Sequence, residues 1–304
     1  MRSRAFPRRA FSSAAALALM LGLAGCGANT SGKPSAAIPA GNVNVLYAGS
    51  LVDVMENGIG PAFHKATGYT LQGIAAGSKA LVNQIKGRLR QGDVFISASP
   101  SVNALLMGKA NGNYVSWYAT FAQAPLVIGY DPTSRFAHDL RTKPWYLVLQ
   151  EPGFRLGRTD PILDPKGALT VQAVQAAQTY YRAPGLAQHI LGGTENPAQV
   201  FPEEDLLGRL QSGQLDAGFF YSNEAAQAHI PVIHLPAALQ FDATFTVTVL
   251  RGAPHAAAAQ AFIRFLLGKE GQAILRGDGL QILPPHLHGN AASVPTNLRR
   301  ILGN

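Results

Sequence analysis

From about residue 42 onward, the chain alternates between short strand-like and helix-like patterns of apolar side chains. Residues 43–47 are rich in β-branched and alternating side chains, and residues 51–55 then place apolar groups at helical spacing. The same succession occurs twice more, which predicts a parallel, doubly wound α/β sheet. The three predicted strand and helix pairs are 43–47 with 51–55, 69–74 with 81–85, and 93–98 with 102–107.

The second half of the chain continues this alternation, with two expected changes of lobe. Residues 125–130 form an apolar strand that we expect to cross into a second lobe, and the strands from residue 232 onward lead back. We therefore predict one lobe from 42–124 and 232–304 and a second from 125–231. Residues 284–304 show no periodic pattern. The other expected elements are a turn-rich loop at 156–167, helices at 169–181, 202–213, 223–229, 256–267 and 270–275, and a strand at 215–221.

Two Gly-Ser turns follow the first two predicted strands, at Gly49-Ser50 and Gly77-Ser78. Serine is a favoured N-cap, so we predict that Ser50 and Ser78 cap the helices that follow. A helix start offers unpaired N–H groups and a positive dipole end, and serine adds a hydroxyl; together these suit a small oxyanion. The alternative is that both serines are structural caps, as in any α/β protein.

Residues 1–26 have the pattern of a signal peptide. Four arginines lie within the first nine residues, an apolar run follows at 14–23, and Leu23-Ala24-Gly25-Cys26 closes the segment. This ending resembles the bacterial lipobox, which implies cleavage before Cys26, a lipid on its sulfur, and a protein tethered in the cell envelope outside the cytoplasmic membrane. A transmembrane anchor is the weaker alternative, because spanning a bilayer takes about 20 apolar residues.

Composition narrows the remaining classes. Cys26 is the only cysteine, so we expect no disulfide framework and no thiol for catalysis or metal binding. Loss of the four leader arginines lowers the formal net charge from +8 to +4, and no Lys/Arg run marks a nucleic-acid site. Residues 27–41, rich in Gly, Ser, Pro and Ala, have the composition of a flexible tether.

Five motifs, in one order, resemble the molybdate/tungstate-binding proteins of ABC importers, in the branch that holds the oxyanion with extra carboxylates. The resemblance covers most of the chain from about residue 42 to residue 283. The motifs are Ala48-Gly49-Ser50-Leu51, Ala76-Gly77-Ser78, residues 93–98, Asp160-Pro161 with Asp164-Pro165-Lys166-Gly167, and residues 215–221.

The resemblance implies a type II periplasmic-binding-protein fold, in which two doubly wound lobes are joined by crossing strands and the ligand lies in the cleft. Cleft closure is then the whole mechanism, without catalysis and without a cofactor. The implied partners are the oxyanion and an ABC permease in the membrane, and the implied state is a monomer. Molybdate and tungstate have nearly the same size and charge, so both remain expected ligands.

The resemblance also implies five ligand-binding residues. Ser50 and Ser78 match serines that donate backbone N–H and hydroxyl hydrogen bonds to the oxyanion. Tyr221 matches a tyrosine that donates its phenol from the second lobe. Asp164 and Glu203 match positions whose carboxylates bind the molybdenum or tungsten atom itself, which expands the tetrahedral oxyanion towards six-coordination.

Carboxylates beside a dianion need a physical reason, because Coulomb repulsion is strong in a dry cleft. The contact becomes favourable only when the carboxylate bonds to the high-valent metal as a hard oxygen donor. Sulfate offers no such bond, so this arrangement predicts selectivity against sulfate. Asp164 before a proline also suits a simple turn, and Glu203 suits a helix dipole. Asp160 and Glu204 are near enough in sequence to replace them.

Other classes of protein remain as alternatives. An enzyme would need a nucleophile with a base, and no Gly-X-Ser-X-Gly or His-Glu-X-X-His motif is present. His286 and His288, one residue apart in the unpatterned tail, leave a zinc site open. Ala168 and Gln123-Ala124 depart from residues common in the family and put the cleft lining in question. A binding protein for sulfate, phosphate or a small organic anion is the closer alternative.

Overall fold

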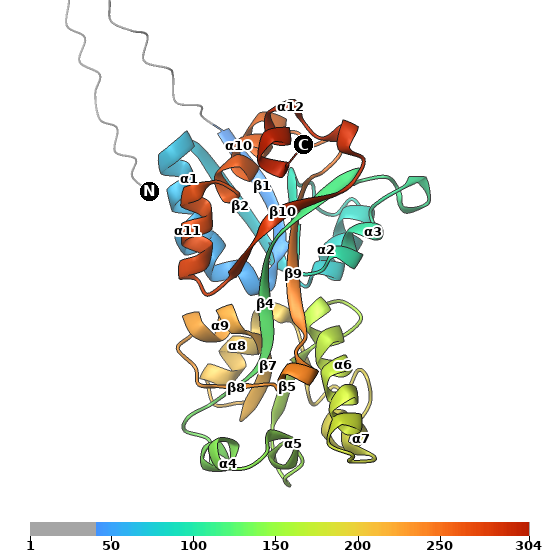
Figure 1. The fold of residues 1–304 in the computed structure, drawn as a ribbon, viewed down its shortest axis with the longest axis vertical. Helices are drawn as coiled ribbons and strands as arrows, with labels where there is room; N and C mark the ends of the chain where they lie inside the picture. The colour runs from blue at the N-terminus through green and yellow to red at the C-terminus, as the bar shows by residue number, and fades with distance from the viewer. Residues whose placement is uncertain (1–40, 304) are drawn as a thin grey trace, which may run out of the picture. The chain divides into compact units, whose positions relative to one another are not determined.

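The computed structural model describes residues 41–303. The predicted signal peptide, the lipidation site Cys26 and the tether up to residue 40 therefore lie outside the described residues. Between residues 41 and 303, ten strands form one mixed sheet in the order β2-β1-β3-β9-β4-β7-β5-β6, with β8 and β10 paired to β4 (Figure 1). None of the helices in this range is long and apolar enough to cross a membrane.

Strands on both sides of β1 build the part of the fold that we call the β1 lobe. β1 (Gly41–Ala48) lies between β2 (Tyr69–Ala76) and β3 (Val94–Ser97) and is parallel to both. β9 (Asp242–Val249) and the first part of β4 (Trp117–Tyr130) continue the sheet in antiparallel pairs. The helices of this lobe are α1 (Gly60–Thr67), α2 (Ser78–Lys86), α3 (Pro100–Ala104), α10 (Ala256–Leu266), α11 (Lys269–Gly277) and α12 (Thr296–Arg299).

The second part of β4 belongs to what we call the β7 lobe. β7 (Ala217–Tyr221) pairs with β4 and is parallel to β5 (Leu156–Thr159), which in turn pairs with β6 (Val200–Phe201). β8 (Val232–His234) pairs with residues 127–129 of β4. The helices of this lobe are α4 (Ala137–Thr142), α5 (Trp145–Val148), α6 (Pro165–Tyr180), α7 (Leu186–Leu191), α8 (Glu203–Gln211) and α9 (Ser222–Gln227).

β4 passes from one lobe to the other without a break. It pairs with β9 as far as Pro125 and with β7 from Leu126 onward. Figure 1 shows β4 and β9 side by side where the lobes join. Because β8 still pairs with β4 inside the β7 lobe, the chain returns to the β1 lobe along β9, later than the expected residue 232. The other predicted lobe limits stay predictions.

Burial explains the strand pattern of β1. Val43, Val45, Leu46 and Tyr47 are all at most 1% exposed, so both faces of this strand are covered, as in other parallel sheets. The predicted doubly wound α/β arrangement is confirmed for this region. The whole sheet is mixed rather than parallel, because β4, β9 and β10 run antiparallel to their neighbours.

The tail, in which the sequence showed no periodic pattern, begins with a strand. β10 (Gln281–Gly289) pairs antiparallel with β4, and its register shifts between Ile282 and His286. Pro284 and Pro285 lie inside this shift, where no N–H is needed for the ladder. The two prolines conceal the strand from sequence analysis because proline is rare within strands. Residues 156–159, expected in a loop, likewise form β5.

The predicted serine caps are wrong at both turns. A short 3-10 helix, η1 (Gly49–Leu51), begins after Ala48, and α2 begins at Ser78 after Gly77. Ala48 and Gly77 are the N-caps, and neither helix has a capping side chain. Each serine lies inside its helix rather than before it, so its hydroxyl does not serve the first amides and is left for other partners.

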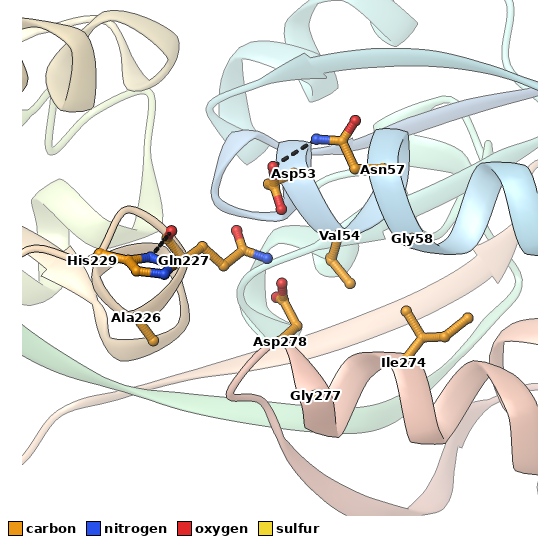
Figure 2. Close-up of a pocket in the computed structure, with 10 residues that line it drawn as sticks. All are labelled: Asp53, Val54, Asn57, Gly58, Ala226, Gln227, His229, Ile274, Gly277 and Asp278. Atoms are coloured by element: carbon orange, nitrogen blue, oxygen red, sulfur yellow. Dashed lines mark hydrogen bonds between the residues drawn. The ribbon is translucent and has the colours of Figure 1, made fainter.

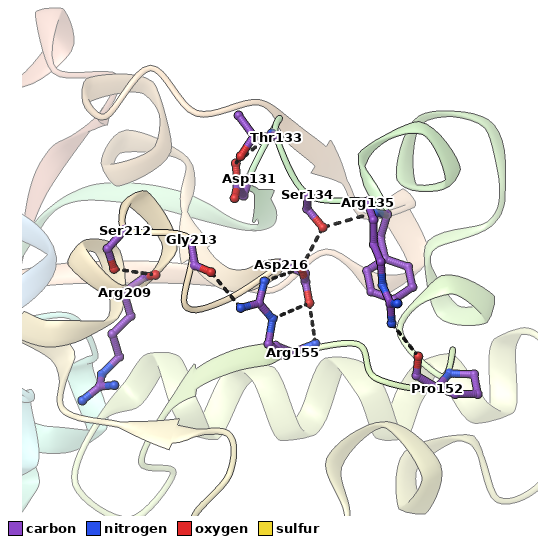
Figure 3. A network of polar contacts seen from close by, with 11 residues as sticks. Asp131, Thr133, Ser134, Arg135, Pro152, Arg155, Arg209, Ser212, Gly213 and Asp216 are labelled. Atoms are coloured by element: carbon purple, nitrogen blue, oxygen red, sulfur yellow. Dashed lines mark hydrogen bonds and ion pairs between the residues drawn. The ribbon is translucent and has the colours of Figure 1, made fainter.

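A polar network holds the strand starts of the β7 lobe together (Figure 3). Asp216, just before β7, accepts hydrogen bonds from the backbone and guanidinium of Arg155 at 2.8 to 3.0 Å and from Ser134 Oγ at 2.7 Å. Burial raises the pKa of Asp216, but these hydrogen bonds outweigh it and hold the pKa below its usual value. A carboxylate satisfied in this way serves the fold.

Candidate functional site

The turns after β1 and β2 meet the β7 lobe at two glycines. A methyl group on Gly49 would lie 2.2 Å from Glu203 Cγ. One on Gly77 would lie 2.8 Å from the Leu163 carbonyl oxygen and 3.1 Å from Asp164 Oδ2. A side chain at either position would force atoms of the β7 lobe to move, so glycine permits this close approach. Both Gly-Ser turns and both predicted carboxylates therefore meet where the lobes touch.

The start of α2 is hydrogen-bonded to the β7 lobe. The N–H groups of Lys79 and Ala80 donate to the Leu163 carbonyl at 3.0 and 3.1 Å, and Lys79 Nζ reaches the Pro161 carbonyl at 3.4 Å. These amides, expected to be unpaired, are thus used within the protein. They link the two lobes across the junction and are not left over for an anion.

Asp164 is the N-cap of α6 and is 6% exposed. Its Oδ1 accepts hydrogen bonds from the Lys166 N–H at 2.6 Å and from Thr159 Oγ1 at 3.3 Å. Its Oδ2 faces the Gly77 turn of the other lobe. The side chain therefore shapes its own turn with one oxygen and presents the other to the junction between the lobes.

Glu203 and Glu224 share one buried lysine. Lys166 Nζ, on α6, lies 2.9 Å from Glu203 Oε2 and 2.7 Å from Glu224 Oε1. Glu203 is the first residue of α8, and Glu224, near the start of α9, also accepts a hydrogen bond from the Tyr221 N–H at 2.7 Å. Sequence analysis missed Lys166 and Glu224. The one available signal for Lys166 was its position inside the motif that carries Asp164.

Two buried hydroxyls beside these carboxylates have no partner among residues 41–303. Tyr221, at the end of β7, is 1% exposed, and Ser50 is 6% exposed; neither hydroxyl makes a hydrogen bond. Ser78 Oγ accepts a hydrogen bond from the Ala98 N–H at 3.1 Å, which leaves its proton for another acceptor. Buried hydroxyls are nearly always hydrogen-bonded, so these groups indicate a missing acceptor.

Asn223 connects the Ser50 turn to α9. Its Nδ2 donates to the Ser50 carbonyl at 2.9 Å, and it is fully buried. This bond spans the junction from the β7 lobe to the β1 lobe. Asn223 was not identified from the sequence, because only the fold brings it to Ser50.

The electrostatics of the site are strongly coupled. Burial raises the pKa of Asp164 and, more strongly, of Glu203, while the charge of Lys166 opposes both shifts. Burial also raises the pKa of Tyr221, and the charges of Asp164, Glu203 and Glu224 raise it further. Burial lowers the pKa of Lys166, but the three carboxylates outweigh it and keep the lysine charged. Perturbed groups gathered at one junction are typical of functional sites.

The two alternative acids differ from the predicted pair. A cavity of about 290 Å³ at the junction is lined by Asp160 and Glu204 as well as by Asp164 and Glu203. Asp160 Oδ1 accepts two backbone N–H groups of its own turn, and Glu204 is exposed. Of these four acids, only Asp164 and Glu203 are buried.

The two tail histidines lie on β10. His286 Nδ1 is 3.0 Å from His288 Nε2, and the His288 ring stacks on Tyr118. Within the described part of the chain, no group of three or more His, Cys, Asp or Glu side chains is arranged to hold a metal ion. These histidines lie outside the junction between the lobes.

Comparison with known proteins agrees with this fold. Residues 43–281 match the family model of bacterial extracellular solute-binding proteins. A solute-binding protein of Petrotoga mobilis is 30% identical over an alignment of 294 positions that covers 86% of this chain and 90% of the relative. The molybdate/tungstate-binding protein WtpA of Thermococcus kodakarensis is 27% identical over an alignment of 341 positions that covers 95% of each chain.

Among solved structures, the periplasmic molybdate-binding protein of Azotobacter vinelandii has the same fold. Its TM-score is 0.62 at 20% identity, over 80% of this chain and 99% of that one. The predicted resemblance and the predicted type II periplasmic-binding-protein fold are both confirmed. The chain belongs to the family of bacterial extracellular solute-binding proteins, and it is a binding component of transport rather than an enzyme.

Proposed function

We propose that this chain captures molybdate or tungstate between its two lobes and delivers it to the permease of an ABC importer. The observation that carries the proposal is the meeting of the five predicted residues at one junction. Ser50 and Ser78 reach it from the β1 lobe, and Asp164, Glu203 and Tyr221 reach it from the β7 lobe. The relatives named for binding molybdate or tungstate agree with this ligand class.

The hydroxyls supply the donors that any tetrahedral oxyanion needs. Ser78 Oγ accepts the Ala98 N–H, which leaves the hydroxyl proton for the ligand. The Ser50 and Tyr221 hydroxyls have no hydrogen-bond partner among residues 41–303. A hydrogen bond from such a donor to a charged oxygen is worth about 1.5–3 kcal/mol. These three groups bind an oxyanion without distinguishing its central atom.

The carboxylates supply the selectivity. Asp164 Oδ2 and the Glu203 carboxylate would donate oxygen lone pairs to molybdenum or tungsten, which accept hard oxygen ligands. Lys166 balances part of the negative charge, because its ammonium group lies 2.9 Å from Glu203. Sulfate and phosphate gain no such bond and meet only the repulsion.

Closure of the lobes would retain the ligand. Leu163 and Asn223 of the β7 lobe bond to the α2 start and to the Ser50 carbonyl of the β1 lobe, which holds the cleft shut. The crossing strands β4 and β9 would act as the hinge, because the chain passes between the lobes along them. The closed form is what the permease would recognise.

The cellular setting of this proposal follows from the leader. A lipid on Cys26 and the tether at residues 27–41 would keep the monomeric binding protein at the outer face of the cytoplasmic membrane, close to its permease. Export and processing are tested by labelling with a radioactive fatty acid. Replacement of Cys26 by serine should abolish the label and release the protein from the membrane fraction.

Isothermal titration calorimetry of the mature chain tests the ligand. Molybdate, tungstate, sulfate and phosphate are added in separate titrations. Tight binding of molybdate and tungstate alone supports the proposal. Equal binding of sulfate or phosphate would favour a general oxyanion carrier, and no heat with any of the four would direct the search to organic anions.

A further inference from the structure

A second cavity lies between the lobes, away from the predicted oxyanion site. It has a volume of about 400 Å³ and is lined by residues of α9 on one side and of α11 and a π-helical turn, η2 (Val54–Ile59), on the other. Figure 2 shows the carboxylates of Asp53 and Asp278 on one wall and the amide of Gln227 directed between them. The volume is within the range of small-molecule sites, roughly 300–1,000 Å³.

The Asp278 carboxylate, which lines this cavity, has one oxygen without a hydrogen-bond partner among residues 41–303. Asp278 is 7% exposed, and the oxygen without a partner is its Oδ2. Asp53, exposed at the rim, accepts a hydrogen bond from Asn57 Nδ2 at 2.6 Å. Neither acid forms an ion pair with a lysine, arginine or histidine of the described chain. Two acids therefore face one cavity without a positive charge.

The surroundings of Asp278 disfavour its negative charge. Burial raises the pKa of Asp278 to about 7; the neighbouring Asn223 side chain opposes this shift, and the charge of Asp53 adds to it. A cation between the two acids would offset their repulsion and favour the ionised form of Asp278.

We propose that this cavity binds a small organic cation, with its ammonium group between Asp53 and Asp278. The apolar walls formed by Val54 and Ile274 suit a short carbon chain beside the charged group. A metal ion fits less well. The cavity is many times the volume of an ion, and no cluster of three His, Cys, Asp or Glu side chains occurs between residues 41 and 303.

The two lobes contribute unlike walls to the cavity. Asp53 and Asp278 come from the β1 lobe, and Gln227 and His229 come from the β7 lobe. His229 is committed to its own loop, because its Nδ1–H donates to the Gln227 carbonyl at 2.6 Å. A cation that contacts both walls favours the closed arrangement of the lobes. By reciprocal linkage, it would then also tighten oxyanion binding, a consequence that rests on the proposed function.

Calorimetry tests the site directly, without any oxyanion. The probe is putrescine, a four-carbon diamine, with 1,4-butanediol as the uncharged control of equal length. We expect putrescine to bind and butanediol to give no heat. Asp278→Asn and Asp53→Asn should each weaken putrescine binding by about 10–100-fold, the value of a charge-assisted contact. Asp53 is exposed at the rim, so its variant keeps the test valid if Asp278→Asn fails to fold.

A matched control variant is Glu195→Gln, which removes one exposed carboxylate elsewhere on the chain. It should leave putrescine binding unchanged. Absence of heat with putrescine up to about 10 mM, or equal loss of binding in Glu195→Gln, overturns the proposal. Tighter binding of Ca²⁺ than of putrescine at the same two acids overturns it in favour of a metal site.

The coupling between the two ligands is measured separately. Tungstate should bind more tightly in the presence of saturating putrescine than in its absence if the lobes close on both ligands. Failure of tungstate binding alone would refute the oxyanion function and leave the direct putrescine result standing. The two hypotheses are therefore distinguishable.

Discussion

The two sides of the junction between the lobes are chemically unlike. The β1 lobe contributes Gly-Ser turns with uncharged hydroxyls and short side chains. The β7 lobe contributes Asp164, Glu203 and Glu224 around the ammonium group of Lys166. Hydroxyls can serve any oxyanion, whereas buried carboxylates reject most of them. The comparison indicates that the β1 lobe provides affinity for the class and the β7 lobe chooses within it.

A second comparison separates structural from candidate ligand-binding acids within the β7 lobe itself. Asp216 has four hydrogen-bond contacts and a lowered pKa. The pKa of Glu203 is strongly raised, because the effect of burial is larger than the opposing effect of the Lys166 charge. The fold therefore stabilises the ionised form of Asp216 and disfavours the ionised form of Glu203. Strain of this kind is expected where a ligand completes the site.

Replacement of Lys166 should have the largest effect. Lys166→Met leaves Glu203 and Glu224 buried without a counter-charge, and breaking a buried ion pair costs about 3–5 kcal/mol. Urea denaturation measures the loss in the free energy of unfolding. Lys143→Met, which breaks an exposed pair with Asp139, is the control and should change little. Equal losses in the two variants would remove the special role of Lys166.

Paired substitutions on the two sides test the division between affinity and selectivity. Ser50→Ala should weaken tungstate, molybdate and any residual sulfate binding alike, by about 10–100-fold. Glu203→Gln keeps the shape but removes the anionic oxygen donor, so it should weaken tungstate and molybdate far more than sulfate. Calorimetry with each oxyanion gives the ratios. The same loss for every oxyanion in Glu203→Gln would leave Glu203 as a structural residue.

A methyl group at Gly49 should impair closure without unfolding either lobe. Gly49→Ala places a carbon 2.2 Å from Glu203 Cγ, and overpacking of this kind costs about 1–3 kcal/mol. Tungstate affinity should fall by about 5–150-fold while the melting temperature changes little. Gly208→Ala, on α8 with no neighbour within 4 Å of the added methyl group, should retain wild-type affinity. If Gly49→Ala also binds normally, the lobes do not close on this turn.

A pH dependence of stability is expected from Asp278. Its folded pKa of about 7 is above the unfolded value of about 3.9, so between these values the native state holds a proton that the unfolded state has lost. The stabilisation is complete below about pH 4 and is lost as the pH rises through about 7. Melting temperatures at about pH 5 and pH 8 should therefore differ less in Asp278→Asn than in the wild type. An unchanged difference would contradict the raised pKa.

Local patterns were enough to find most elements of the fold. The period of apolar residues located β1, β2 and β3 and the long helix α6, because each depends on neighbours within a few positions. The prediction of serine caps was wrong because the N-cap is set by backbone conformation. Ala48 and Gly77 have the non-helical backbone of an N-cap, and each helix begins directly after them. β10 was not predicted because it contains two prolines. A strand tolerates them at a register shift, and that shift is defined by the pairing with β4.

By itself, the sequence determined most of the strands and helices in their order, the family resemblance, and the positions of the Gly-Ser turns and candidate acids. Only the tertiary structure decided which charges meet. Lys166 lies 37 residues from Glu203 and 58 from Glu224, so no local period could pair them. The close approach of Gly49 to Glu203 and the cavity beside Asp278 likewise depend on how the two lobes pack together. Such contacts arise from packing of distant segments, which local side-chain patterns do not encode.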